Sequence, residues 1–154
     1  MPKDPLDVAI TNDLIGQVNI ASAESLTYVR HASPQFGAYA GLANNERSRP
    51  AARIAYQGMV KGFLKVQNWA KDSLATTGWL TPGTDGPGLV DTNLAAMRRY
   101  LELVYDKSFF EGEELRPLEE WYARFQKLPW WEALEERTDA HMPELKFTVE
   151  DVGS

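Results

Sequence analysis

The stretch SRPAARIAYQGMVKGFLKVQNWAKDSLA, residues 48–75, carries the clearest helical pattern in the chain and decides its fold class. Pro50 suits the first turn of a helix, because its missing N–H would have no intrahelical partner there. Large apolar residues recur at spacings of three and four and form one face, made of Tyr56, Met59, Val60, Phe63 and Val66. We therefore predict a long amphipathic helix in this stretch.

A strip of small residues runs beside that apolar face: Ala51, Ala55, Gly58 and Gly62. Each glycine inside a helix costs up to about 1 kcal/mol relative to alanine, so some other interaction should compensate. We expect a second helix to approach closely at this strip. The alternative is a small-molecule pocket at the same notch, which would make the protein a small enzyme or a ligand-binding protein. Its lining would be Tyr56, Gly58, Gly62, Phe63 and Trp69.

The same predicted helix is basic. Residues 47–71 contain six Lys and Arg side chains and no Asp or Glu, whereas residues 111–150 hold eleven acidic and five basic side chains. Nucleic-acid binding through Arg49, Arg53, Lys61 and Lys65 is one interpretation. The net charge of −6 argues against it, because attraction to phosphates would be local and readily screened. An acidic protein partner, or this chain's own acidic part, fits the basic helix better.

Periodic apolar residues predict further helices on both sides of this one, over 5–30, from about 91 to 111, from 117 to 128 and from 129 to 137. Segments 31–48 and 76–90 follow no period and are predicted as long loops. The tail, 143–154, alternates apolar and polar residues like a short strand, which would stay extended or pair with another chain. We predict one mainly α domain over 1–154, an irregular bundle of about five helices with two long irregular segments and a short extended C-terminal tail.

Three of the five tryptophans lie in LEEWYARFQKLPWWEALEER, residues 118–137. The helical spacing places a set of apolar residues inward, comprising Leu118, Trp121, Tyr122, Phe125 and Leu128. Trp130 and Trp131 are neighbours and cannot point the same way. One of the two is therefore predicted to be left over for a partner, because a large aromatic at a rim is a typical interface anchor.

The residues present exclude several kinds of chemistry. The chain has no cysteine, which excludes disulfides and thiolate metal sites, and only two histidines, His31 and His141, which excludes a three-histidine zinc site. Walker A, Gly-x-Gly-x-x-Gly and Gly-x-Ser-x-Gly motifs are absent from the sequence. Asp139, His141 and Glu144 could meet one divalent metal, but polar residues are expected after a helix in any case. We predict no catalytic, cofactor or metal site, and an enzymatic role is left open but not favoured.

No apolar stretch approaches the ~18 residues that a membrane span needs, and the first residues carry no apolar signal core, so a cytoplasmic location, or a virion, is expected. We expect a non-catalytic helical subunit that docks in a larger assembly, as an accessory subunit of an enzyme or as a virion or other structural component. The partner would be another protein or a second copy of the chain. The predicted contact residues are Phe36, Tyr39, Trp79, Trp131 and Phe147.

Overall fold

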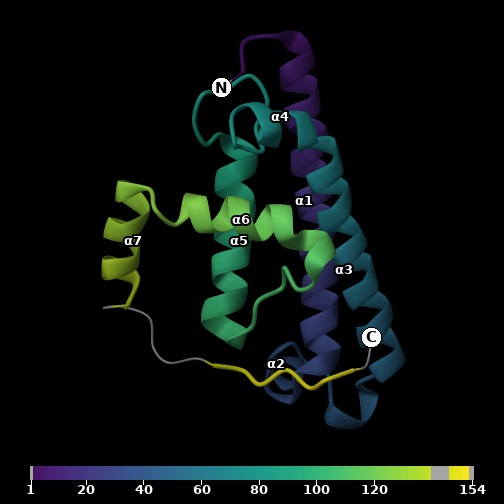
Figure 1. Ribbon diagram of the computed structural model, residues 1–154. Coiled ribbons are helices and arrows are strands. Elements are labelled where there is room, and N and C mark those ends of the chain that lie inside the picture. Colours follow the sequence, from purple (N-terminus) through teal and green to yellow (C-terminus); the bar gives the residue numbers. More distant parts are fainter. Residues whose placement is uncertain (1, 140–145, 153–154) are drawn as a thin grey trace.

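The computed structural model describes residues 2–139 and 146–152 and confirms a mainly α fold (Figure 1). The described part contains seven α-helices and two short 3-10 helices, and no strand. Their bounds are α1 Pro5–Ala32, α2 Pro34–Tyr39, η1 Asn44–Glu46, α3 Arg49–Trp69, α4 Lys71–Thr76, α5 Leu89–Tyr105, η2 Glu113–Leu115, α6 Arg116–Phe125 and α7 Pro129–Asp139.

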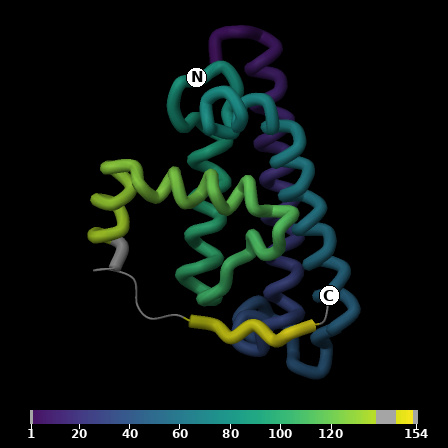
Figure 2. The backbone as a smooth tube through the Cα atoms, in the orientation of Figure 1, coloured from purple at the N-terminus to yellow at the C-terminus, as the bar shows by residue number. Residues whose placement is uncertain are grey.

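Helices α1 and α3 form a long antiparallel pair, against which the rest of the fold is built (Figures 1 and 2). Asp4 caps α1 by accepting a hydrogen bond from the Leu6 N–H at 2.8 Å, and Ser48 caps α3 by accepting one from the Ala51 N–H at 3.2 Å. Helix α1 continues without a break through Gly16 to Ala32. Its buried face, packed on α3 and α5, outweighs the weak helix propensity inside it.

The segment 31–48 is more ordered than the predicted loop. Helix α1 takes its first two residues, and α2 and η1 take nine of the rest. Ser33 caps α2: its side chain accepts a hydrogen bond from the Phe36 N–H at 3.3 Å. Helices of one or two turns are too short to show a period in the sequence, which is why the pattern predicted a loop.

The second predicted loop, 76–90, is largely irregular in the structure, between the end of α4 at Thr76 and the start of α5 at Leu89. Helix α5 ends at Tyr105 and is capped by Asp106, which adopts a left-handed conformation with φ of 50°, so the helix stops before the predicted break at Gly112. Helix α6 then crosses α5, and α7 turns away beyond it (Figure 1). The aromatic side chains of α6 and α7 complete the core against α5 and the loops.

The tail, residues 146–152, is extended but pairs with no strand in the described part of the chain. It runs across the lower end of the molecule, beside α2 (Figure 2). The Phe147 N–H donates to the Val104 carbonyl at 2.7 Å, and the Glu150 N–H donates to the Ala32 carbonyl at 2.9 Å. Both carbonyls belong to final turns of helices, which lack intrahelical donors. The tail therefore closes the ends of α5 and α1.

Candidate docking surfaces

The five predicted contact residues are distributed unequally between core and surface. Trp79 is 8% exposed and Trp131 is 5% exposed, so both side chains are buried in the core and are not available to a partner. Phe36 and Phe147 are half-buried and pack on each other with ring centroids 6.1 Å apart. Tyr39 is 83% exposed. Of the five, only Tyr39 offers most of its side chain to a partner.

The tryptophan left at the surface is Trp130, not Trp131. Trp130 is 46% exposed, whereas the Trp131 ring packs edge-on against Phe125 at 5.1 Å and Tyr122 at 6.4 Å. The sequence could not choose between the two neighbours, because the choice depends on how α7 is rotated about its axis. That rotation is set by contacts with α5 and α6.

The glycine notch of α3 holds another helix. A Cβ added at Gly62 would lie 2.8 Å from the Ala21 Cβ of α1, and one added at Gly58 would lie 3.0 Å from the Glu24 carboxyl carbon. The expected close approach of a second helix is therefore the arrangement found, and α1 fills the notch that was the alternative site for a small molecule. Phe63 is buried in the core, and Trp69 is 45% exposed.

The outward side of α3 carries exposed cations without internal partners. Arg49, Arg53, Lys61 and Lys65 are all exposed, and their side chains make no hydrogen bond or ion pair with another residue in the described ranges. Within the part of the chain that the structure describes, Arg47 is the one basic residue of the 47–71 segment paired with the acidic C-terminal part; its Nη2 lies 2.6 Å from the Glu150 carboxylate. The expected attraction within the chain thus involves Arg47 and leaves α3 itself unneutralised.

A groove of about 590 Å³ lies between α3 and the segment before α6. Three half-buried residues spaced by four, Tyr56, Val60 and Leu64, form its apolar floor along about 12 Å of helix. The other lining residues are polar: Gln57 and Lys61 on α3, and Glu111 and Glu114 opposite. We name this feature the α3 groove. Tyr56 thus lines a surface groove, on a side of α3 away from the glycine notch.

At the Tyr56 end of the α3 groove, an ammonium group packs near two tyrosine rings and a carboxylate. The Lys107 ammonium lies 5.9 Å from the ring centroids of both Tyr28 and Tyr56, and its Nζ is 4.0 Å from the Glu111 carboxylate. The Tyr56 hydroxyl donates to Glu111 at 3.4 Å. Burial, followed by the charge of Glu111, raises the pKa of Tyr56, and the same causes raise the pKa of Tyr28 to about 12. Both hydroxyls therefore stay neutral, as polar contacts.

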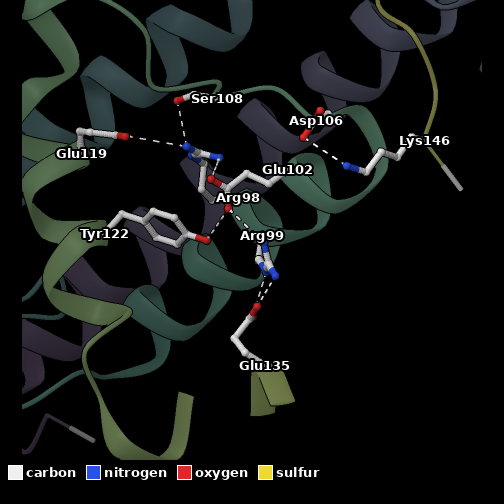
Figure 3. Close-up of polar contacts among 9 residues, drawn as sticks. All are labelled: Arg98, Arg99, Glu102, Asp106, Ser108, Glu119, Tyr122, Glu135 and Lys146. Carbon is white, nitrogen blue, oxygen red and sulfur yellow. Dashed lines mark hydrogen bonds and ion pairs between the residues drawn. The ribbon is translucent and has the colours of Figure 1, made fainter. Parts of the chain in front are cut away.

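A second polar region surrounds the C-terminal half of α5 (Figure 3). Arg98 is 2% exposed and lies between two rings, with its guanidinium carbon 5.3 Å from the Phe110 centroid and 5.0 Å from the Tyr122 centroid. Its Nη1 is 2.8 Å from Glu102, and its Nη2 donates to Ser108 at 2.8 Å. These contacts hold α5, α6 and the segment between them in one arrangement.

Arg99 joins α7 to α5 in the same region. Its guanidinium donates to Glu135 through both Nε, at 2.9 Å, and Nη2. Burial would lower the pKa of Arg99, but the hydrogen bond and the charge of Glu135 outweigh burial and raise it. Burial, and then Glu102, which accepts from the Tyr122 hydroxyl at 2.8 Å, raise the pKa of Tyr122.

A cavity of about 440 Å³ adjoins this network, but the charges lining it are paired within the chain. Arg99 pairs with Glu135, Glu102 with Arg98, and Lys146 with Asp106 at 3.5 Å (Figure 3). The cavity thus marks a structural network: Arg99 holds α7, Asp106 holds the tail through Lys146, and Glu102 pairs with Arg98 within α5. We therefore take the α3 groove, whose basic flank has no ion-pair partner in the described ranges, as the candidate functional site.

The buried carboxylate of Asp91 is structural. It accepts five hydrogen bonds, from the Leu80, Thr81 and Gly88 N–H groups, the Thr81 hydroxyl and the Trp121 indole, at 2.7–3.0 Å. It lies at the start of α5 and fixes the 77–88 loop. Sequence reasoning missed it; the only available signal was an acidic residue in the first turn of a predicted helix after a Gly-rich loop.

The described ranges hold neither a metal-binding cluster nor a membrane-spanning helix. No group of three or more His, Asp or Glu there could hold a metal ion. His141 and Glu144 lie outside the described residues, as does the side chain of Asp139. None of the helices in the described ranges combines the length and the apolar character to cross a bilayer.

Comparison with known proteins adds no outside evidence. No family model, curated protein or solved structure matches this chain. Its function must therefore be argued from its own residues.

Proposed function

We propose that the protein is a non-catalytic helical subunit that docks in a larger assembly through the α3 groove and the basic side of α3. One observation carries the proposal: Arg49, Arg53, Lys61 and Lys65 are exposed and have no ion-pair partner among the described residues, in a chain whose net charge is −6. The chain has many carboxylates, yet none of the described ones pairs with these cations. The cations are therefore available to bind an anionic surface of a partner. The partner we infer is an acidic protein segment.

The shape of the groove supports a helical ligand. Tyr56, Val60 and Leu64 offer an apolar floor about two turns long, flanked by Lys61, and an amphipathic helix lays its apolar face into such a groove. Acidic side chains of that helix would meet Lys61 and Lys65 at one edge. Glu111 and Glu114 at the opposite edge favour basic residues on the other side of the same helix. Opposite charges at the two edges would fix the orientation of the bound helix.

The test is charge reversal with a matched control. A photocrosslinking residue at position 57, inside the groove, is combined with Lys61→Glu and Lys65→Glu; the control carries Lys3→Glu and Lys127→Glu, two exposed lysines away from the groove with the same change in net charge. In extracts of the native source, a single protein adduct is expected for the parent and the control, and its loss for the groove variant. Native mass spectrometry of the purified complex then gives the stoichiometry.

Two results would overturn the proposal. The first is a strictly monomeric chain with no adduct at position 57 in any extract. The second is adduct formation with nucleic acid together with salt-dependent retention on DNA, which would favour the nucleic-acid role of the same cations. A protein adduct that is equally abundant in the groove variant would place the docking surface elsewhere.

A further inference from the structure

The tail lies in a groove built by four separate parts of the chain. Its two backbone hydrogen bonds use the free carbonyls at the ends of α5 and α1, as described above. The ring of Phe147 lies 6.1 Å from that of Phe36 in α2 and 6.1 Å from that of Tyr105 in α5. We call this the tail groove. These backbone and ring contacts of the tail are with elements far away in sequence.

Glu150 adds a charged contact three residues after Phe147. Arg47, whose side chain is 10% exposed, points its Nη2 at the Glu150 carboxylate at 2.6 Å. The same guanidinium is held in place by the His31 carbonyl, which accepts from Nε at 3.0 Å, and by the Asn44 side chain, which accepts from Nη1 at 2.8 Å. A pre-oriented, largely buried Arg is the kind of residue that gives carboxylate recognition its geometric specificity.

The walls of the tail groove are held by contacts that do not involve the tail. Phe36 and Tyr105 pack edge-on with centroids 5.9 Å apart, and Tyr105 packs in turn against Phe109. The two carbonyls belong to helices buried in the core, and Arg47 is fixed by His31 and Asn44. The groove is therefore expected to persist when the tail leaves it, and a preformed groove costs a ligand less ordering free energy.

These features are those of a peptide-binding site: two backbone acceptors, an aromatic cradle, and an Arg placed for a carboxylate three residues on. We propose that the tail groove is a docking site for an extended peptide, filled by the chain's own tail in one molecule and by the tail of a second copy when copies are brought together. The occupant follows from the structure, because the sequence KFTVEDV, residues 146–152, is the ligand that the groove is seen to hold.

The exchange needs no new contact, since the tail of a second copy meets the same atoms. Within one molecule, the covalent connection gives the tail a high effective concentration, and exchange is therefore favoured only where copies are concentrated, as in an assembly. The site is separate from the α3 groove, so either proposal can fail without the other.

The test supplies the tail as a separate molecule. A full-length variant carrying Phe147→Ala and Glu150→Ala keeps the groove but weakens its own tail, and a dye-labelled KFTVEDV peptide is titrated into it by fluorescence anisotropy. We expect binding at least about tenfold tighter than to the parent chain, whose own tail competes. Adding Arg47→Glu to the variant should weaken peptide binding by about tenfold or more. A peptide with alanine in place of its Phe should not bind.

A second measurement decides the matter if the doubly substituted chain is destabilised. The Arg47→Glu chain has an intact tail and a damaged groove, while the Phe147→Ala, Glu150→Ala chain has the reverse. We expect neither to associate alone, and their equimolar mixture to sediment as a 1:1 complex. Peptide binding that is equal in the parent and the variant, or a mixture that sediments only as monomers, would overturn the proposal.

Discussion

The indole N–H of Trp121 donates a hydrogen bond of 2.8 Å to Asp91 Oδ1, and both side chains are almost completely buried. Trp121 lies on α6 and Asp91 at the start of α5, thirty residues earlier. The same carboxylate holds the N–H groups of Leu80 and Thr81. One contact therefore connects the helix that covers the core to the loop that precedes α5.

Replacing Trp121 by Phe removes that donor while keeping an aromatic ring. We expect the free energy of unfolding to fall by about 1–3 kcal/mol, because Asp91 loses one buried hydrogen bond and the smaller ring leaves space in the core. Urea denaturation checks this. The control is Trp130→Phe, at 46% exposure, which should change stability by no more than about 0.5 kcal/mol. Equal losses for the two variants would contradict a structural role for the indole N–H.

Replacing either of two helical glycines by alanine should change the stability of the protein, in opposite directions at the two positions. At Gly62 the new Cβ would meet the Ala21 Cβ at 2.8 Å, so Gly62→Ala should destabilise by about 1–3 kcal/mol despite its better helix propensity. At Gly16 in α1 nothing lies within 4 Å, so Gly16→Ala should stabilise by about 0.5–1 kcal/mol.

Adding Ala21→Gly to the Gly62→Ala variant tests the stated cause. The double substitution should recover most of the loss, because the Cβ that clashed is gone. Thermal unfolding of the three variants and the parent forms a double-mutant cycle. Loss of stability at both Gly62 and Gly16 would show that the close approach of α1 and α3 is not the deciding factor.

Stability should fall at alkaline pH through buried tyrosines. Burial raises the pKa of Tyr28 to about 12 and also raises the pKa values of Tyr56, Tyr105 and Tyr122. A hydroxyl that ionises near pH 10 in the unfolded chain and higher in the folded chain stabilises the fold fully below about pH 10. That contribution is lost as the pH rises toward about 12 for Tyr28.

The measurement is urea denaturation at several pH values between about 8 and 11, with tyrosinate absorbance followed in parallel. Each unit by which a folded pKa is raised corresponds to about 1.4 kcal/mol. Tyr28→Phe removes one such group, so the variant should show a smaller decrease in stability with pH than the parent. A stability that is independent of pH over this range would be inconsistent with neutral buried hydroxyls.

The position of α7 should depend on the pair between Arg99 and Glu135. Arg99→Ala removes both hydrogen bonds to Glu135. Relative to the parent, amide hydrogen exchange should accelerate more in α7 than in α1 or α3. The loss in global stability should be modest, about 1 kcal/mol, because the pair is partly exposed. Arg116→Ala is the control, since its ion pairs with Glu113 and Glu120 are more exposed. Unchanged exchange in α7 would show that aromatic packing alone holds the helix.

Much of the helical framework could be predicted because it depends on local patterns. The apolar spacing of 48–75 predicted one long helix, which the structure divides at Ala70 into α3 and α4, and Pro117 and Pro129 marked the first turns of α6 and α7. Strong periodicity over many residues is a signal that survives in any tertiary context. Helices α2 and η1 were missed because three to six residues carry too little pattern. Helix α2 is stabilised by its Ser33 cap and by the packing of Phe36, and in η1 the Glu46 carboxylate accepts a hydrogen bond from the Ala43 N–H.

The candidate sites could be predicted only in part. The sequence located the cations of α3 and the small-residue strip, and it marked Phe36 and Phe147 as apolar residues outside the predicted helices. It did not show that these two rings contact each other, or that the side chains of Trp79 and Trp131 are buried in the core. Such pairings join residues far apart in the chain, and no local spacing encodes them.

By itself, the sequence determined where this chain must be helical, which chemistries it lacks, and how unevenly its charge is distributed, since each of these follows from residue types and their spacing. Only the tertiary structure decided which helices and which distant side chains meet in the core. Packing α1 against Gly62 filled the notch, left the cations of α3 facing outward, and brought Arg47 within reach of Glu150. The reason is physical: burial and ion pairing depend on distances in space, and those distances are set by how all the helices pack together.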